Sequence, residues 1–183
     1  MRAVTLFLLL LSLSALAQPR ALSRTAEFDA LFAGLKAAPS EETAAKIETR
    51  LRQLWSLSVA PSAILLLNRS TRELGHDAPQ EALEDVEAAL VIDPDAPEGY
   101  HRRALVRSAL GDFPGALADL QETLKREPRY FPALQSLSRI AENREDYKGA
   151  LSAWEKVLEL NPRLSDGQDR LKALTRKVFG DDT

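Results

Sequence analysis

The 183-residue sequence contains no cysteine. This absence excludes disulfide bonds, thiolate metal ligands, a cysteine nucleophile and the lipidated cysteine of a bacterial lipoprotein. The stability of the folded chain must therefore come from packing. Hydrophobic residues make up 45% of the sequence, which is sufficient for a core, and the length is that of one domain.

Residue patterns that carry catalysis are also lacking. The two histidines, His76 and His101, are too far apart for the i, i+4 spacing of metal ligands on a helix, and we expect both to be exposed. The segment from Gly111 to Gly115 contains Pro114 and matches no phosphate-binding loop, and no serine lies in a nucleophile-elbow motif. We predict no catalytic residue, no metal and no cofactor; an enzyme is kept only as an alternative.

Positive charge is not in excess. The sequence has 24 Lys and Arg against 27 Asp and Glu, a net charge of −3. Nucleic acid and anionic lipid surfaces attract basic proteins, so neither partner has electrostatic support here. We predict no nucleic-acid partner.

The N-terminus has the pattern of a secretory signal. Arg2 is followed by the apolar run 3–13 and by small residues at Ala15 and Ala17. We predict a signal peptide at 1–17, cleaved after Ala17, and a periplasmic protein without membrane contact after cleavage. A membrane anchor is the alternative, but a span needs about 20 apolar residues and this run is shorter and ends before Pro19.

Three prolines, Pro94, Pro128 and Pro162, lie 34 residues apart. Because proline cannot continue a helix and disfavours helical backbone in the residue before it, each marks a helix end at the same phase of a repeat. Small, aromatic and apolar residues recur at matching offsets. In the middle copy they are Tyr100, Ala104, Gly111, Asp112, Phe113, Ala116, Leu117 and Leu120, and in the next Leu134, Ser138, Asp146, Tyr147, Ala150, Leu151 and Trp154.

This 34-residue pattern resembles the tetratricopeptide repeat (TPR) family. The resemblance implies an all-α fold, an α-α superhelix (solenoid) of three helix hairpins at 63–94, 97–128 and 131–162. It also implies a protein that binds other proteins.

The flanks of the repeats carry weaker patterns. Residues 18–24 have no periodicity, and we predict a flexible arm. Residues 25–58 contain two amphipathic helices, which we interpret as an N-terminal capping pair or a degenerate repeat that either caps the stack or covers its groove. Residues 165–179 form an amphipathic pattern that fits a C-terminal capping helix.

Two positions of the repeat change together. The seventh residue is Arg69, Arg103 and then Leu137, while the twenty-third is Asp85, Asp119 and then Ala153. These positions face each other in an antiparallel hairpin. We predict structural ion pairs between Arg69 and Asp85 and between Arg103 and Asp119.

The resemblance also implies a concave groove lined by the first helix of each hairpin. Its polar, partner-facing residues are expected to be Asn68, Thr71, His101, Arg102, Gln135, Arg139, Glu142 and Asn143. The cations among them could bind an acidic side chain or a chain terminus of a partner, because guanidinium groups fit carboxylates. An ordinary solvated inner face is the alternative.

The carboxylate clamp of chaperone-binding members of the family is absent. The corresponding positions hold Leu67, Thr71, Arg102, Pro132 and Ser136. We predict an exported, non-enzymatic scaffold that binds a protein or peptide in this groove. The alternative is a structural subunit of a cell-envelope assembly that associates through its end repeats.

Overall fold

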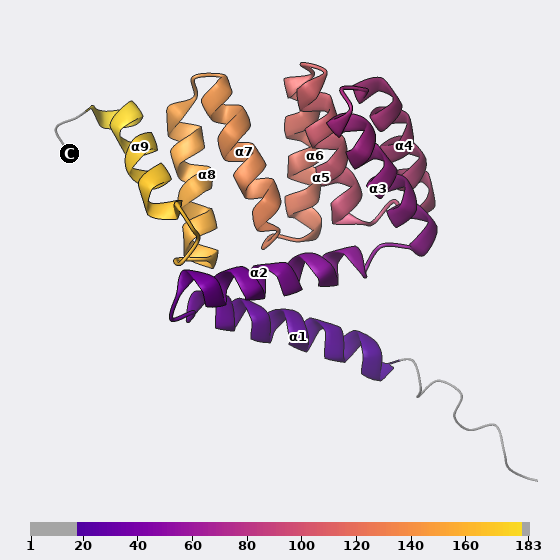
Figure 1. Cartoon of the computed structure of the whole chain (residues 1–183), viewed down its shortest axis with the longest axis horizontal. Helices are drawn as coiled ribbons and strands as arrows, with labels where there is room; N and C mark the ends of the chain where they lie inside the picture. Colours follow the sequence, from indigo (N-terminus) through magenta and orange to yellow (C-terminus); the bar gives the residue numbers. More distant parts are fainter. Residues whose placement is uncertain (1–17, 181–183) are drawn as a thin grey trace, which may run out of the picture.

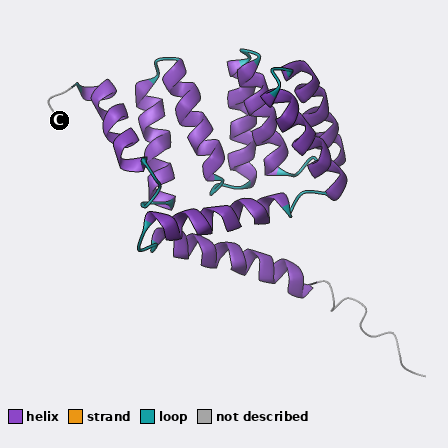
Figure 2. Cartoon of the chain, viewed as in Figure 1, coloured by secondary structure: helices purple, strands orange, loops and turns teal. Residues whose placement is uncertain are grey.

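The computed structural model describes residues 18–180, which form nine α-helices and no strand (Figures 1 and 2). The predicted signal peptide at 1–17 lies outside the described residues. The helices are α1 (Gln18–Lys36), α2 (Glu41–Ser56), α3 (Pro61–Gly75), α4 (Pro79–Ile92), α5 (Pro97–Ala109), α6 (Phe113–Arg126), α7 (Phe131–Asn143), α8 (Tyr147–Leu160) and α9 (Gly167–Phe179). None of them is long and apolar enough to cross a membrane.

Three hairpins, α3–α4, α5–α6 and α7–α8, stand side by side in a row (Figure 1). The predicted fold class, an all-α solenoid, is confirmed. Each second helix ends two residues before its proline, because the preceding residue takes up extended backbone; Glu127, for example, has φ −135° and ψ 93°.

Aspartates begin two of the second helices. Asp112 and Asp146 accept hydrogen bonds from the backbone N–H groups of Gly115 and Gly149, both at 2.9 Å. A Cβ atom at either glycine would collide with the capping carboxylate, which accounts for glycine at both positions.

The ion pairs follow the repeat register. Arg103 donates to both carboxylate oxygens of Asp119, with Nη2 2.7 Å from Oδ1, and Arg69 bonds Asp85 in the same way in the first hairpin. Arg107 adds a bond to Asp119 at 2.8 Å that the repeat comparison does not predict. The Asp119 carboxylate is buried, so these three groups hold α5 against α6.

The N-terminal pair α1–α2 neither extends the row nor fills the groove. It runs across the lower ends of the hairpins, where the loops between repeats lie (Figure 1). Trp55 of α2 is central to this contact. Its ring lies 4.4 Å from Tyr130 and 5.3 Å from Phe131, both at the start of α7, and it also packs against Phe28 and Phe32 of α1.

Two polar contacts support the same junction. The Asn161 side chain donates to Glu48 at 2.6 Å, and Arg129 pairs with Asp29 at 2.7 Å. Both join the N-terminal pair to a loop between repeats. The pair therefore packs along the edge of the stack at which these loops lie.

The segment 18–24, for which we predicted a flexible arm, is helical, because α1 begins at Gln18. A proline is tolerated in the first turn of a helix, where its missing N–H group needs no partner. The lack of apolar periodicity in this segment did not prevent helix formation.

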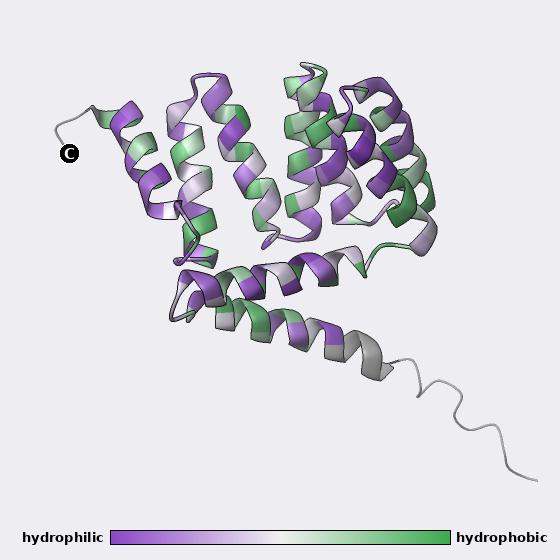
Figure 3. Cartoon of the chain, in the orientation of Figure 1, coloured by the Kyte–Doolittle hydropathy of each residue, from purple (hydrophilic) through white to green (hydrophobic). Residues whose placement is uncertain are grey.

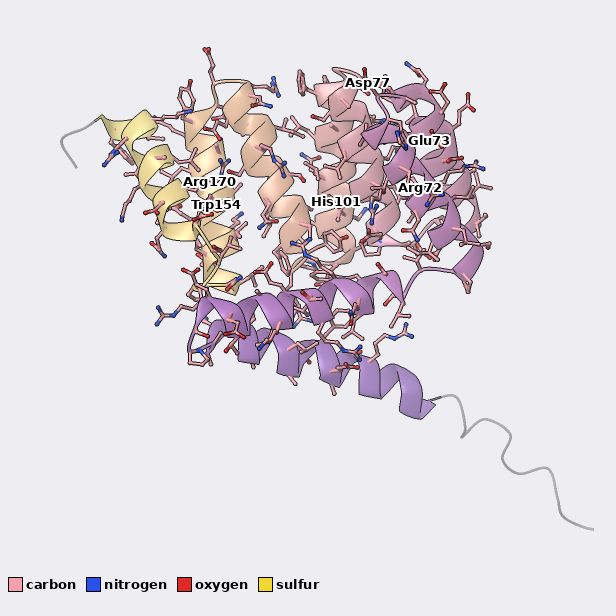
Figure 4. The ribbon with its side chains drawn as sticks, in the orientation of Figure 1. Arg72, Glu73, Asp77, His101, Trp154 and Arg170 are labelled. Carbon is pink, nitrogen blue, oxygen red and sulfur yellow. The ribbon has the colours of Figure 1, made fainter. Side chains whose placement is uncertain are left out.

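The C-terminal helix α9 packs against α8, as expected for a cap. Leu174 is 1% exposed, and the Trp154 indole N–H donates to the Gly167 carbonyl at 2.9 Å. The Arg170 guanidinium lies 4.8 Å from the centre of the Trp154 ring (Figure 4). These contacts cover the last hairpin on the side away from α6.

Replacement of Trp55 by alanine should lower the free energy of unfolding by about 3 to 5 kcal/mol, because it empties the centre of the aromatic junction. Chemical denaturation followed by circular dichroism measures this change. The nearby Leu57→Ala variant is the control, since Leu57 is 66% exposed and should change the free energy by less than about 0.5 kcal/mol. Equal, small effects of the two variants would contradict this account of the junction.

Candidate partner-binding groove

Two adjoining pockets follow the inner face of the stack. The first, of about 250 Å³, lies between α2, α3, α5 and the start of α7. The second, of about 100 Å³, lies between α5 and α7, and Leu105 lines both. The first is lined by Arg52, Ser56, Ser70, Thr71, Leu74, Glu98, His101, Arg102, Leu105, Val106, Tyr130 and Pro132, and the second by Leu105, Ser108, Ser136, Arg139, Ile140 and Asn143.

A buried polar network forms the wall of the first pocket. Glu98 accepts hydrogen bonds from Arg102, with Nε 2.7 Å from Oε1, and from the Tyr130 hydroxyl. Arg102 also donates to the Thr71 hydroxyl. The network links α3, α5 and α7, so the shape of the pocket is fixed before any partner binds.

His101 lies in the same wall, between α5 and α7 (Figure 4). Its Nε2 is 3.1 Å from the Ser136 hydroxyl, and its ring meets the Tyr130 ring edge-on at 5.3 Å. The sequence-based expectation of an exposed His101 is therefore wrong: the side chain is 7% exposed. The next hairpin covers this part of α5, which a single helix pattern does not reveal.

Burial controls the titration of this network. Loss of solvent lowers the pKa of His101 to about 4 despite the nearby Glu98 charge. Burial also raises the pKa of Tyr130 well above 10, and Glu98 adds to this effect. For Glu98 burial acts to raise the pKa, but the Arg102 charge and the Tyr130 hydrogen bond outweigh it and lower the pKa.

Only some of the predicted groove residues line the two pockets. Thr71, His101 and Arg102 line the first pocket, and Arg139 and Asn143 line the second. Arg102 is held by Glu98 and Thr71, so its role is structural. The remaining members differ: Asn68 is exposed on α3 outside both pockets, Gln135 is partly buried on α7, and Glu142 pairs with Arg170 at 2.9 Å and Lys177 at 2.7 Å of α9.

Arg52 is a pocket residue that the sequence analysis missed. Its guanidinium lies over the Phe131 ring at 4.9 Å, and its nearest carboxylate, Glu48, is 3.6 Å away. The side chain is 47% exposed. No repeat position predicts it, because α2 lies outside the 34-residue register. Arg52 and Arg139 are thus the exposed cations of the two pockets.

Metal chemistry finds no support in this part of the chain. Within residues 18–180, no three His, Asp or Glu side chains are grouped so that they could hold a metal ion.

Comparison with known proteins extends the structural result. No protein-family model matches the chain. A TPR repeat-containing protein of Rhizobium etli is 28% identical over 155 residues, which is 85% of this chain and 76% of that protein. The Sgt2 TPR domain of Aspergillus fumigatus superposes with a TM-score of 0.60 at 28% identity, over 66% of this chain and 81% of that one.

The first TPR domain of Spaghetti, solved with an HSP90 peptide, also has a TM-score of 0.60, at 20% identity over 66% of this chain and 96% of that one. The fold is thus a TPR solenoid. Among the described residues it has three complete hairpins and a single helix, α9, where a fourth hairpin would begin.

Buried His101 should make the stability of the chain depend on pH. Because its folded pKa, about 4, lies below the unfolded value of 6.5, the unfolded state binds more protons between these values. Stability should therefore fall as the pH falls from 6.5 towards 4, by up to about 1.4 kcal/mol per pH unit. Urea denaturation between about pH 5 and 7 measures the slope, in a range above the Glu98 titration.

His101→Gln should flatten this slope. The matched variant His76→Gln removes the exposed histidine at the end of α3 and should keep the wild-type slope. A wild-type slope in His101→Gln would show that another group causes the pH dependence.

Proposed function

We propose that this chain is an exported, non-enzymatic scaffold that binds an extended segment of a partner protein along its two pockets. The observation that carries the proposal is the pair of adjoining pockets, with a shape fixed by the Glu98 network and a surface that combines apolar walls with polar groups. Such a surface is typical of peptide recognition, where a few placed polar groups set orientation.

The exposed cations favour an acidic segment. Arg52 at the first pocket and Arg139 at the second can each bind a carboxylate through two parallel hydrogen bonds. The similar Spaghetti domain binds the peptide SRMEEVD, which is also acidic. In this chain the cations stand at different positions from the chaperone clamp, and one comes from outside the repeats.

The groove is tested with the double variant Arg52→Glu and Arg139→Glu. Affinity capture from a periplasmic extract identifies a partner with the wild-type chain, and a peptide from it is then titrated by fluorescence anisotropy. Binding should weaken at least about tenfold in the variant, since two attractive contacts become repulsive. The control, Lys156→Glu with Lys172→Glu, makes the same charge change on exposed residues of α8 and α9 and should bind normally. Equal affinity of the two variants would exclude this groove.

Export is proposed from the signal pattern at 1–17. Cleavage after Ala17 would leave α1 to α9 whole, because α1 begins at Gln18. When the full chain is produced in a Gram-negative host, the mature protein should be in the periplasmic fraction, and mass spectrometry should find Gln18 at its N-terminus. Ala17→Gln should block cleavage, because signal peptidase accepts small residues there. Recovery of uncleaved wild-type chain in the cytoplasm would refute the proposal.

A further inference from the structure

The outer face of the first hairpin is uncovered. Among the described residues, no helix lies beyond α3 and α4 at that end of the row (Figure 1). Apolar side chains are exposed there: Leu65 of α3 is 69% exposed, and Ile92 at the end of α4 is 46% exposed. Hydrophobic colour is strong at the lower ends of these two helices (Figure 3).

In the later repeats, the residues at the corresponding position pack against the preceding hairpin. The third residue of the later repeats is Gly99, Ala133 or Gly167, and each is buried. A Cβ atom at Gly99 would strike Leu90 of the preceding hairpin, and one at Gly167 would strike Leu158. The third position is therefore the point of closest contact with the preceding hairpin, and in the first repeat it is the exposed Leu65.

The tenth position follows the same rule. In the later repeats it is Val106, Ile140 or Leu174, at most 4% exposed. In the first repeat it is Arg72, which is exposed and makes no ion pair among the described residues (Figure 4). The face of α3 that corresponds to a packing surface thus combines an apolar residue with a free cation.

The facing helix supplies the opposite charge. Glu81 and Glu84 are exposed on α4 and have no ion pair within the described chain. Because α3 and α4 are antiparallel and Arg69 bonds Asp85, Arg72 stands level with the Glu81–Glu84 turn. Leu65 and Ile92 stand together at the other end. The face therefore has an apolar end and a charged end, with positive charge on α3 and negative charge on α4.

We propose that this face binds the same face of a second copy of the chain. The two-fold axis runs parallel to the helices, in the contact plane and midway between α3 and α4. It places α3 of each copy against α4 of the other without a shift along the helix direction. Leu65 then meets the apolar end of α4 in the second copy, and Arg72 meets its Glu81 and Glu84. Because the contact is symmetric, each of these two matches occurs twice.

The size of the face sets the expected strength. Helices of 15 and 14 residues are roughly 21 Å long, so together they present a surface of roughly 400 Å² per copy. Standard interfaces use about 800 Å² per partner. The dimer should therefore be weak, with dissociation in the micromolar range, and sensitive to salt. It does not depend on the groove.

Sedimentation equilibrium of the purified chain, from about 1 μM to about 500 μM at low salt, tests the proposal. The wild-type chain should dimerise. Arg72→Glu alone and Glu81→Arg with Glu84→Arg alone should each weaken dimerisation at least about tenfold, because like charges then meet twice. A mixture of these two variants should restore association, since every contact between unlike copies is again attractive.

Further variants separate this result from misfolding and from groove binding. Circular dichroism should be unchanged in all charge variants, because the residues are exposed, and Leu65→Asp should also prevent dimerisation. The groove variant Arg52→Glu with Arg139→Glu should dimerise like wild type. A monomeric wild-type chain over the whole range, variants that dimerise normally, or a mixture that stays monomeric would each overturn the proposal.

Discussion

The close contact of each hairpin with the one before it determines the form of the whole chain. The third repeat position holds a small residue: Gly99, Ala133 or Gly167. It lets each helix lie so close to the preceding hairpin that a larger side chain would collide. The tenth position, Val106, Ile140 or Leu174, fills the space beside this approach. The same contact brings α7 over α5, so that Ser136 and Tyr130 cover His101. A curved stack with a polar network inside its inner wall follows from this geometry.

The N-terminal pair completes the inner surface instead of lengthening the stack. Trp55 fixes α2 to the start of α7 through its ring alone, because its buried Nε1 has no hydrogen-bond partner in the described structure. Arg52, one turn earlier on α2, is thereby held at the edge of the first pocket. The junction that stabilises the pair thus also places a cation at the edge of the first pocket.

How far the sequence predicts this structure depends on the range of the interaction. The hairpins, their boundaries and the pairs of Arg69 with Asp85 and Arg103 with Asp119 follow from the repeat, because they depend on local helix ends and on packing within one hairpin. Placement of the groove residues was only partly predictable. Arg139 and Asn143 line a pocket, whereas Glu142 pairs with α9, and Arg102 is held by Glu98. The partners of Glu142 lie on α9, outside its own hairpin, whereas Glu98 lies four residues before Arg102 on the same helix.

The sequence by itself determined a helical repeat of fixed period, since proline, small residues and apolar spacing act on the backbone nearby and impose the same unit each time. Only the tertiary structure decided which polar groups of that unit are exposed and unpaired. It buried His101, turned α1–α2 across the loops and left the outer face of α3 and α4 uncovered. The physical reason is that exposure and charge pairing depend on neighbours far away in the chain, such as Asn161 beside Glu48, and no local pattern records them.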